Sequence, residues 1–265
     1  MEIGKIGVIG AGRMGQALIS GLTASLVSPA DVIVFDVDKS KLADLTKLKV
    51  KIAESSQAVV TSSDIILLAV KPQAIDKVLA EIKTLVSEKQ VVVSIAAGIT
   101  LTHLSAALKT KKIFRVMPNN PSLVGAGMAA ISGLGKEKSD NAVVTKIFEA
   151  VGAVVFVEEK MMDAVTGLSG SGPAFVYLFI RSLIAAGKKL GLDEKTAKAL
   201  ALQTVAGSVA VLQKTKIEPT KLIDMVKSPG GTTIEGLKVL EEGKFQEMVV
   251  AAVAAASRRS QELSQ

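Results

Sequence analysis

Short apolar runs alternate with amphipathic segments through the first 160 residues. Five runs predict strands, at 3–9, 32–35, 65–70, 91–95 and 113–116. The early runs are continuously apolar, which is typical of parallel strands that are covered on both faces. Helices are expected between them, around 40–47, from 72 to about 86, and in a short segment from about 101. The pattern predicts an α/β fold with a Rossmann-type, doubly wound and mostly parallel sheet. Two further strand candidates, 128–132 and 153–157, flank a predicted helix at 139–151.

The pattern changes near residue 160. Beyond it we expect no strand, only long helices rich in Ala, Leu and Val, at 162–189, 193–214, 219–227, 232–242 and 245–262. The chain is therefore divided into a dinucleotide-binding domain, 1–160, and an all-α domain, 161–265. Residues 248–256 (MVVAAVAAA) offer apolar groups on every face, so this helix must be buried on all sides. A bundle of about 100 residues cannot do this alone, which predicts a homodimer.

Composition excludes several kinds of site. The 265 residues include no Cys and one His, so thiolate, iron–sulfur and multi-histidine metal sites are excluded and no metal is expected. Aromatic residues make up 3%, and the net charge of +7 is spread along the chain, so no nucleic-acid partner is expected. The uncharged stretches 90–108, 116–135 and 164–180 contain Gly, Pro and polar residues. We interpret them as buried core and expect a cytoplasmic protein without membrane contact.

The sequence GAGRMG follows the first predicted strand and opens a helix. Gly10 permits a tight turn, Gly12 lets the backbone approach a pyrophosphate, and Gly15 allows close helix–strand packing. An acid, Asp36, ends the second strand 21 residues after Gly15. This context matches the dinucleotide-binding fingerprint. The expected cofactor-binding residues here are Gly10, Ala11, Gly12, Arg13, Met14, Gly15 and Asp36.

The identity of the cofactor stays open between NADPH and NADH. A carboxylate at position 36 favours NADH, because it bonds the ribose 2′-hydroxyl and repels a 2′-phosphate. However, Arg13, Lys39 and Lys41 are near enough in sequence to offset its charge.

Further residues are expected at the carboxyl ends of the third and fourth strands, where ligands of open parallel sheets lie. The third strand ends in Ala69, Val70, Lys71 and Pro72, and Ala97 with Gly98 follows the fourth. They are expected to line the ribose and nicotinamide side of the cofactor.

Two segments of the helical domain combine glycines and hydroxyls at helix starts, Thr166–Ala174 and Ser228–Gly236. Both present backbone N–H groups without a charged side chain, which suits a small carboxylate. Two ordinary capped helix ends are the alternative interpretation.

Five motifs of this chain resemble those of a known protein family. They are PTKLIDMVKSPGGTTIEGLKVLEE at 219–242, DAVTGLSGSGPAF at 163–175, AVKP at 69–72, AAG at 96–98 and MPNNP at 117–121. In these, and along essentially its whole length, the chain resembles pyrroline-5-carboxylate reductases. The resemblance implies hydride transfer from NADPH or NADH to the C=N carbon of Δ1-pyrroline-5-carboxylate, giving L-proline. It also implies an interlocked dimer, which in many members assembles into a decamer.

The resemblance also implies roles for individual residues. Thr233 matches the threonine proposed to bond the ring nitrogen and assist its protonation. Ser56 matches a cofactor contact, Glu159 a substrate-side position, and Asn119 lies near the expected nicotinamide. The loops around the substrate carboxylate are matched by Thr166, Gly170, Ser171, Ser228, Gly230, Gly231 and Thr232.

Related imine reductases and β-hydroxyacid dehydrogenases are the alternative. The hydroxyacid pattern needs a lysine and an asparagine where this chain has Val176 and Ile180, so that route would lack its acid. A non-catalytic homologue is a second alternative, but it would be expected to lose the intact SPGGTT segment.

Overall fold

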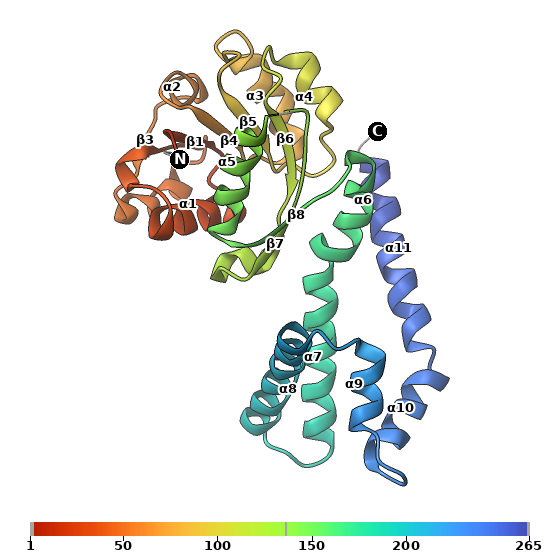
Figure 1. Cartoon of the computed structure of the whole chain (residues 1–265). Coiled ribbons are helices and arrows are strands. Elements are labelled where there is room, and N and C mark those ends of the chain that lie inside the picture. The colour runs from red at the N-terminus through yellow and green to blue at the C-terminus, as the bar shows by residue number, and fades with distance from the viewer. Residues whose placement is uncertain (1–2, 136, 264–265) are drawn as a thin grey trace. The chain divides into compact units, whose positions relative to one another are not determined.

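The computed structural model describes residues 3–135 and 137–263. Within them, eight strands form one sheet in the order β3-β2-β1-β4-β5-β6-β7-β8 (Figure 1). Every neighbouring pair is parallel except β6 and β7, which are antiparallel. The strand order reverses at β1 and β4, which is the switch point where such sheets bind ligands. The strands are β1 (Ile6–Ile9), β2 (Val32–Phe35), β3 (Lys51–Ile52), β4 (Ile65–Leu68), β5 (Val91–Ser94), β6 (Ile113–Met117), β7 (Gly127–Gly133) and β8 (Gly152–Phe156).

Alternate residues of each central strand feed two hydrophobic cores, one on each face of the sheet. Ile65 and Leu67 point to a core shared with α1 (Arg13–Ser25) and α5 (Lys138–Glu149). Ile66 and Leu68 point to the opposite core, shared with α2 (Ser56–Thr61), α3 (Ile75–Ile82) and α4 (Leu101–Ala107). The continuously apolar strands thus arise because both faces are covered, and the expected doubly wound sheet is confirmed.

Beyond β8, the described residues up to Leu263 form helices and turns and no strand, as expected. They include α6 (Met162–Val165), a turn of π-helix (Thr166–Gly170), α7 (Gly172–Lys189), α8 (Glu194–Thr215), α9 (Pro219–Val226), α10 (Thr232–Glu242) and α11 (Phe245–Leu263). Contacts group the chain up to Ser171, with residues from Ala254 on, into one compact unit, and Gly172–Val253 into another. Within the second unit, α7 and α8 form a helical hairpin in which Gly187 lies close to Ala197. A domain boundary at residue 160 stays a prediction.

Some local predictions were wrong. The helix expected around 40–47 is instead two 3₁₀ turns, Lys39–Leu42 and Leu45–Leu48, and the second ends at Lys49 in the left-handed conformation (φ 60°). Two short elements, β3 and α2, were not predicted. β3 has only two residues and both are exposed, so it carries no apolar signal.

The prediction that residues 164–180 are buried core was also wrong for the single chain, in which many of these residues are exposed. By length and composition alone, the helical stretch Glu159–Lys189 could cross a membrane, and its most apolar 18-residue window contains no buried residue. On α7, the side chains of Val176, Leu178 and Phe179 are 40–52% exposed. A π-turn interrupts this stretch at Thr166–Gly170, and Pro173 follows it, so it is not a regular spanning helix.

Candidate active site

The residues after β1 form a turn that requires glycine at two positions. Gly10 has a φ of 106°, and a Cβ there would lie 2.5 Å from the carbonyl oxygen of Ala69. A Cβ on Gly15 would overlap the carbonyl oxygen of Gly10. Gly12 differs, because a Cβ there would meet nothing within 4 Å. The turn therefore places bare backbone beside open space at the start of α1.

The start of α1 suits an anion. Gly12 is the N-cap of this 13-residue helix and, having no side chain, makes no capping hydrogen bond to the first N–H groups. Uncapped N–H groups and the helix dipole favour a phosphate. Arg13 is exposed beside them, whereas Met14 packs partly against the core. This open cradle fits the pyrophosphate of a dinucleotide.

Asp36, directly after β2, is tied to the glycine turn and is only 8% exposed. Its carboxylate accepts hydrogen bonds from the N–H of Ala11 at 2.7 Å and of Asp38 at 2.8 Å. Lys41 Nζ lies 3.3 Å from the same carboxylate and offsets its charge. The side chain of Gln16 adds a second link, donating to the carbonyl oxygens of Ala11 and Lys41 at 3.1 Å each. Segment 36–41 and the turn are therefore one hydrogen-bonded unit.

The other expected cofactor residues follow β4 and β5. The Ala69 N–H donates to the Ile9 carbonyl at 2.8 Å, which continues the pairing of β1 with β4. Exposed Lys71 precedes the 3₁₀ turn that Pro72 begins, with half-buried Val70 before it. After β5, exposed Ala97 and left-handed Gly98 (φ 79°) form a turn. These residues lie at the carboxyl ends of their strands, and their contact with a cofactor stays a prediction.

Ser56 is placed differently from the strand-end residues. It is 2% exposed at the first position of α2, and the neighbouring Ser55 caps that helix through the Ala58 N–H. A cofactor contact of Ser56 stays a prediction.

Asn119 lies between β6 and β7 and uses both ends of its amide. Its Nδ2 donates to the carbonyl oxygen of Ser169 at 3.1 Å, and its Oδ1 accepts from the N–H of Met128 at 2.8 Å. Neither contact of Asn119 was predicted from the sequence. The expected proximity of Asn119 to the nicotinamide stays a prediction.

The segment Thr166–Gly170 is a π-turn inside a helical stretch, not a free helix start. The Ser171 N–H reaches back five residues to the Thr166 carbonyl at 2.8 Å. The sequence predicted that segment Thr166–Ala174 presents its backbone N–H groups to a small carboxylate, but the Ser171 N–H is bonded within the chain. Single π-turns often occur at functional sites. The hydroxyl of Thr166 donates to the Met162 carbonyl at 2.8 Å.

Residues Ser228–Gly231 form the turn that opens α10. Pro229 and left-handed Gly230 (φ 69°) occupy its two central positions, and the Gly231 N–H donates to the Ser228 carbonyl at 2.8 Å. This is the arrangement of a type II turn, which needs glycine at its third position. Gly231 is the N-cap of α10 and, having no side chain, makes no capping hydrogen bond to the helix. As predicted, Thr232 and Thr233 stand on its first turn.

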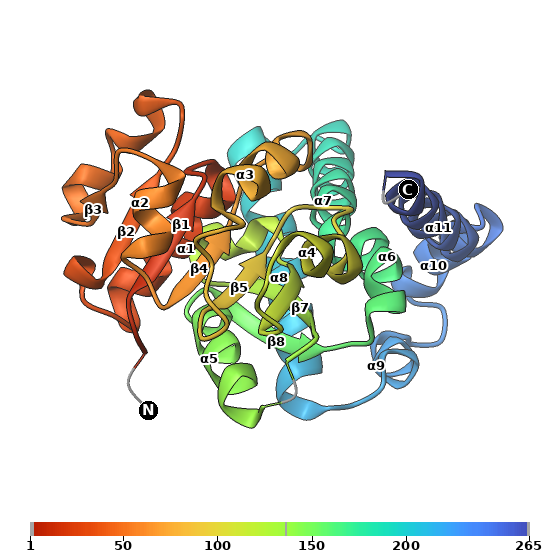
Figure 2. The same cartoon turned by 90° about the horizontal axis from the view of Figure 1, so that it is seen from above.

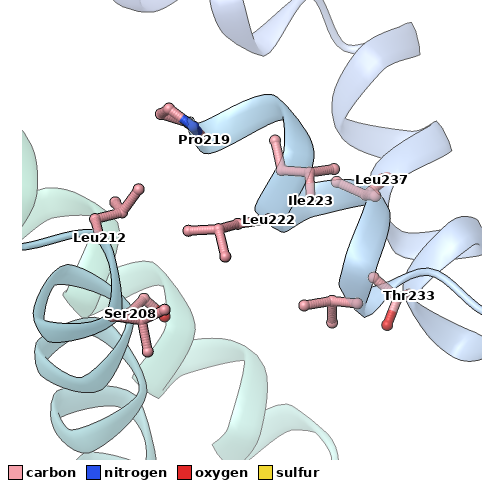
Figure 3. A pocket seen from close by; sticks show the side chains of 9 residues that line it. Ser208, Leu212, Pro219, Leu222, Ile223, Thr233 and Leu237 are labelled. Atoms are coloured by element: carbon pink, nitrogen blue, oxygen red, sulfur yellow. The ribbon is translucent and has the colours of Figure 1, made fainter. Parts of the chain in front are cut away.

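Thr233 lines an apolar pocket in the helical unit (Figure 3). The pocket has a volume of about 410 Å³, and Ser208 and Thr233 supply its side-chain hydroxyls. The lining comes from α8, α9 and α10: Ser208, Val211, Leu212, Pro219, Leu222, Ile223, Val226, Thr233 and Leu237. A hydroxyl beside an uncapped helix end and an apolar wall can hold a small anionic ring.

Glu159 is held by internal partners. Its Oε1 accepts from the Leu101 N–H at 2.6 Å and from Arg115 Nη1 at 3.3 Å. Arg115, in β6, is only 6% exposed. The pair therefore joins the segment before α6 to the sheet, and the expected substrate contact of Glu159 stays a prediction.

Sequence reasoning missed Gln16 and Arg115. The role of Arg115 could have been predicted, because it is the one charged residue in an otherwise apolar strand and so requires a partner of opposite charge. The role of Gln16 could not, since its two acceptors are backbone carbonyls.

Comparison with known proteins agrees with this geometry. Residues 159–263 match the family model of pyrroline-5-carboxylate reductase dimerisation. Residues 5–98 match the family model described as NADP oxidoreductase, coenzyme F420-dependent.

Individual relatives extend over the whole chain. The chain is 42% identical over 264 residues to pyrroline-5-carboxylate reductase of Arabidopsis thaliana, covering 98% of this chain and 96% of the relative. It is similar to a pyrroline-5-carboxylate reductase structure from Coxiella burnetii (TM-score 0.93, 34% identity, all of both chains covered). It is also similar to the Plasmodium falciparum pyrroline carboxylate reductase with NADP bound (TM-score 0.90, 36% identity, all of both chains covered). With its glycine turn, its SPGG turn and these full-length relatives, the chain belongs to the pyrroline-5-carboxylate reductase family.

Proposed function

We propose that this chain reduces L-Δ1-pyrroline-5-carboxylate to L-proline with NADPH or NADH, the last step of proline biosynthesis. The observation that carries the proposal is the SPGG turn. It leaves the N-terminus of α10 uncapped and places Thr233 in an apolar pocket. The names of the full-length relatives and the NADP in the Plasmodium structure support it.

The dinucleotide is held by the glycine turn. The N–H groups at the start of α1 bind its pyrophosphate, with Gly12 leaving room for close approach. When bound, the reduced nicotinamide supplies the hydride. Asp36 and Lys41 hold the shape of the turn by their contacts with Ala11 and with each other.

The substrate is an imine, and its protonated form is already electrophilic, so the chain needs to orient it and exclude water. The N–H groups of Thr232 and Thr233 bind the carboxylate at the start of α10. The Thr233 hydroxyl bonds the ring nitrogen and holds a proton there, while the apolar lining excludes water. The hydride adds to the imine carbon and the proton stays on nitrogen, giving the secondary amine. No strong base is required.

The apolar surface of the helical unit supports a homodimer. On α11, the side chains of Met248, Val249 and Val250 are 42–61% exposed, and on α9 those of Met225 and Val226 are 65–66% exposed. Exposure on this scale marks an interaction surface. The dimerisation model matches the same residues. A second copy of the chain would bury 248–256, which the single chain does not. The proposal includes a further assembly of such dimers into decamers.

The localisation and the partners of the enzyme are also part of the proposal. We expect it in the cytoplasm, with a small-molecule substrate and without a membrane or nucleic-acid partner.

An absorbance assay tests the activity. Purified protein is mixed with pyrroline-5-carboxylate and either NADPH or NADH, and the loss of absorbance at 340 nm is followed. We expect turnover with at least one cofactor, and proline as the product. Absence of turnover with both would overturn the proposal.

A further inference from the structure

Pro173 leaves a carbonyl without its usual helical partner. In an α-helix the N–H of a residue bonds the carbonyl four residues earlier, and proline has no N–H. The carbonyl four residues before Pro173 belongs to Ser169. It accepts instead from Asn119 Nδ2 at 3.1 Å. A side chain from the loop after β6 thus replaces a backbone donor that the sequence removes.

The other end of the same amide is anchored to the sheet. Asn119 Oδ1 accepts from the Met128 N–H of β7 at 2.8 Å. The two bonds fix the orientation of the amide, because a flipped amide would place an N–H₂ group against the Met128 N–H and an oxygen against the Ser169 carbonyl. Asn119 is therefore a two-ended link between β7 and the π-turn.

Met117 contacts the same turn from the same segment. A Cβ on Gly170 would lie 2.7 Å from Met117 Cε, so the absence of a side chain at Gly170 lets Met117 lie against it. The turn is closed internally by the bond from the Ser171 N–H to the Thr166 carbonyl. The MPN segment thus holds the π-turn through one hydrogen bond and one packing contact.

We propose that Asn119 is a positioning residue that fixes the π-turn Thr166–Gly170 by supplying the donor that Pro173 lacks. It acts on substrate affinity through Thr166 and Ser171, which the resemblance places near the substrate carboxylate. This inference rests on the proposed function, since the turn affects catalysis only if it faces the substrate.

The first test separates substrate binding from cofactor binding. In Asn119→Ala we expect the KM for pyrroline-5-carboxylate to rise about tenfold, while the Kd of NADPH, measured by its fluorescence, changes less than twofold. Asn141→Ala, on α5, is the matched control and leaves both values unchanged. A weakened NADPH Kd with an unchanged KM would overturn the proposal, because Asn119 would then serve the cofactor.

The second test is a double-mutant cycle with Pro173→Ala. Alanine at 173 restores an N–H that can bond the Ser169 carbonyl. The effect of Asn119→Ala on KM is then expected to be at least threefold smaller in the Pro173→Ala background than in the wild type. An equal effect in both backgrounds would contradict the proposed link.

Hydrogen exchange tests the link without any activity. In Asn119→Ala, amides 166–172 are expected to exchange at least tenfold faster, while those of α1 stay unchanged. Unchanged exchange at 166–172 would overturn the positioning role. Should the wild type show no turnover, the proposed function fails, and the exchange experiment still decides this inference.

Discussion

At the residue scale, the carboxylate of Asp36 has two roles, one in the shape of the glycine turn and one in the choice of cofactor. Its bonds to Ala11 and Asp38 shape the turn. Its negative charge lies where the dinucleotide fingerprint predicts the cofactor ribose. Lys41 Nζ, at 3.3 Å, offsets part of that charge. The acid was predicted from its spacing after the glycines, and Lys41 was predicted as one of the residues that could offset its charge. Its hydrogen bonds with the N–H groups of Ala11 and Asp38 were not predicted, because they depend on the path of segment 36–41.

Replacing Asp36 with Ser is expected to shift preference toward NADPH by about tenfold, since a charge that repels a 2′-phosphate is removed. The shift is measured as the ratio of kcat/KM for NADPH and NADH. Asp44→Ser removes an exposed carboxylate outside the turn and leaves the ratio unchanged. An unchanged ratio in Asp36→Ser would show that the acid acts only on the turn.

Replacing Thr233 with Val is expected to lower kcat about 10²-fold, because the hydroxyl that holds the proton at the ring nitrogen is lost while the volume is kept. Thr233→Ser retains a hydroxyl and should keep most of the activity. Both are measured by the 340 nm assay at saturating substrate. A full rate in Thr233→Val would assign the proton to solvent or to another group.

At the element scale, the sequence predicted what periodicity encodes. The continuously apolar strands and the long apolar helices were recovered close to their ends, as with α8 at Glu194–Thr215. Two of the wrong predictions concern turns that are set by hydrogen bonds. The 40–47 segment has helical spacing, yet Asp38 caps a 3₁₀ turn there. The π-turn at Thr166–Gly170 was missed in the same way, since its hydrogen bonds include one from Asn119, which is far away in sequence.

Glycine at 230 is predicted to be essential to the SPGG turn. Gly230→Ala forces a side chain into the left-handed region (φ 69°), which costs about 1–2 kcal/mol. Because the strained turn displaces the start of α10, the KM for pyrroline-5-carboxylate should rise while the NADPH Kd holds. Gly236→Ala is the matched control, since a Cβ there meets no atom within 4 Å and α10 gains about 0.5–1 kcal/mol of stability. Equal KM values in both variants would contradict the role of the turn.

At the scale of the whole molecule, the helical unit exposes many large apolar side chains. Figure 2 shows α7 and α11 from above, and their apolar residues include Val176, Phe179 and Met248, each 40–58% exposed. From the sequence, the apolar residues 248–256 led to the prediction that the helical domain alone cannot bury them. They also led to the prediction that a second copy of the chain covers them. Which side chains meet across that interface depends on the partner and not on local pattern.

Introducing charge on α11 is expected to break the assembly. In Met248→Glu/Val250→Glu, burial of two carboxylates at an apolar interface is unfavourable, so the dimer dissociates and turnover falls at least tenfold. Light scattering after size exclusion gives the mass. Leu85→Glu, an exposed apolar position outside the helical unit, is the control and keeps both mass and activity. A dimeric, active double variant would place the interface elsewhere.

The most direct test of the account is a crystal structure with proline and NADP⁺ bound. We expect the proline carboxylate on the N–H groups at the start of α10, its ring nitrogen beside Thr233, and the pyrophosphate on the glycine turn at Gly12. Proline bound away from residues 228–233 would contradict the account.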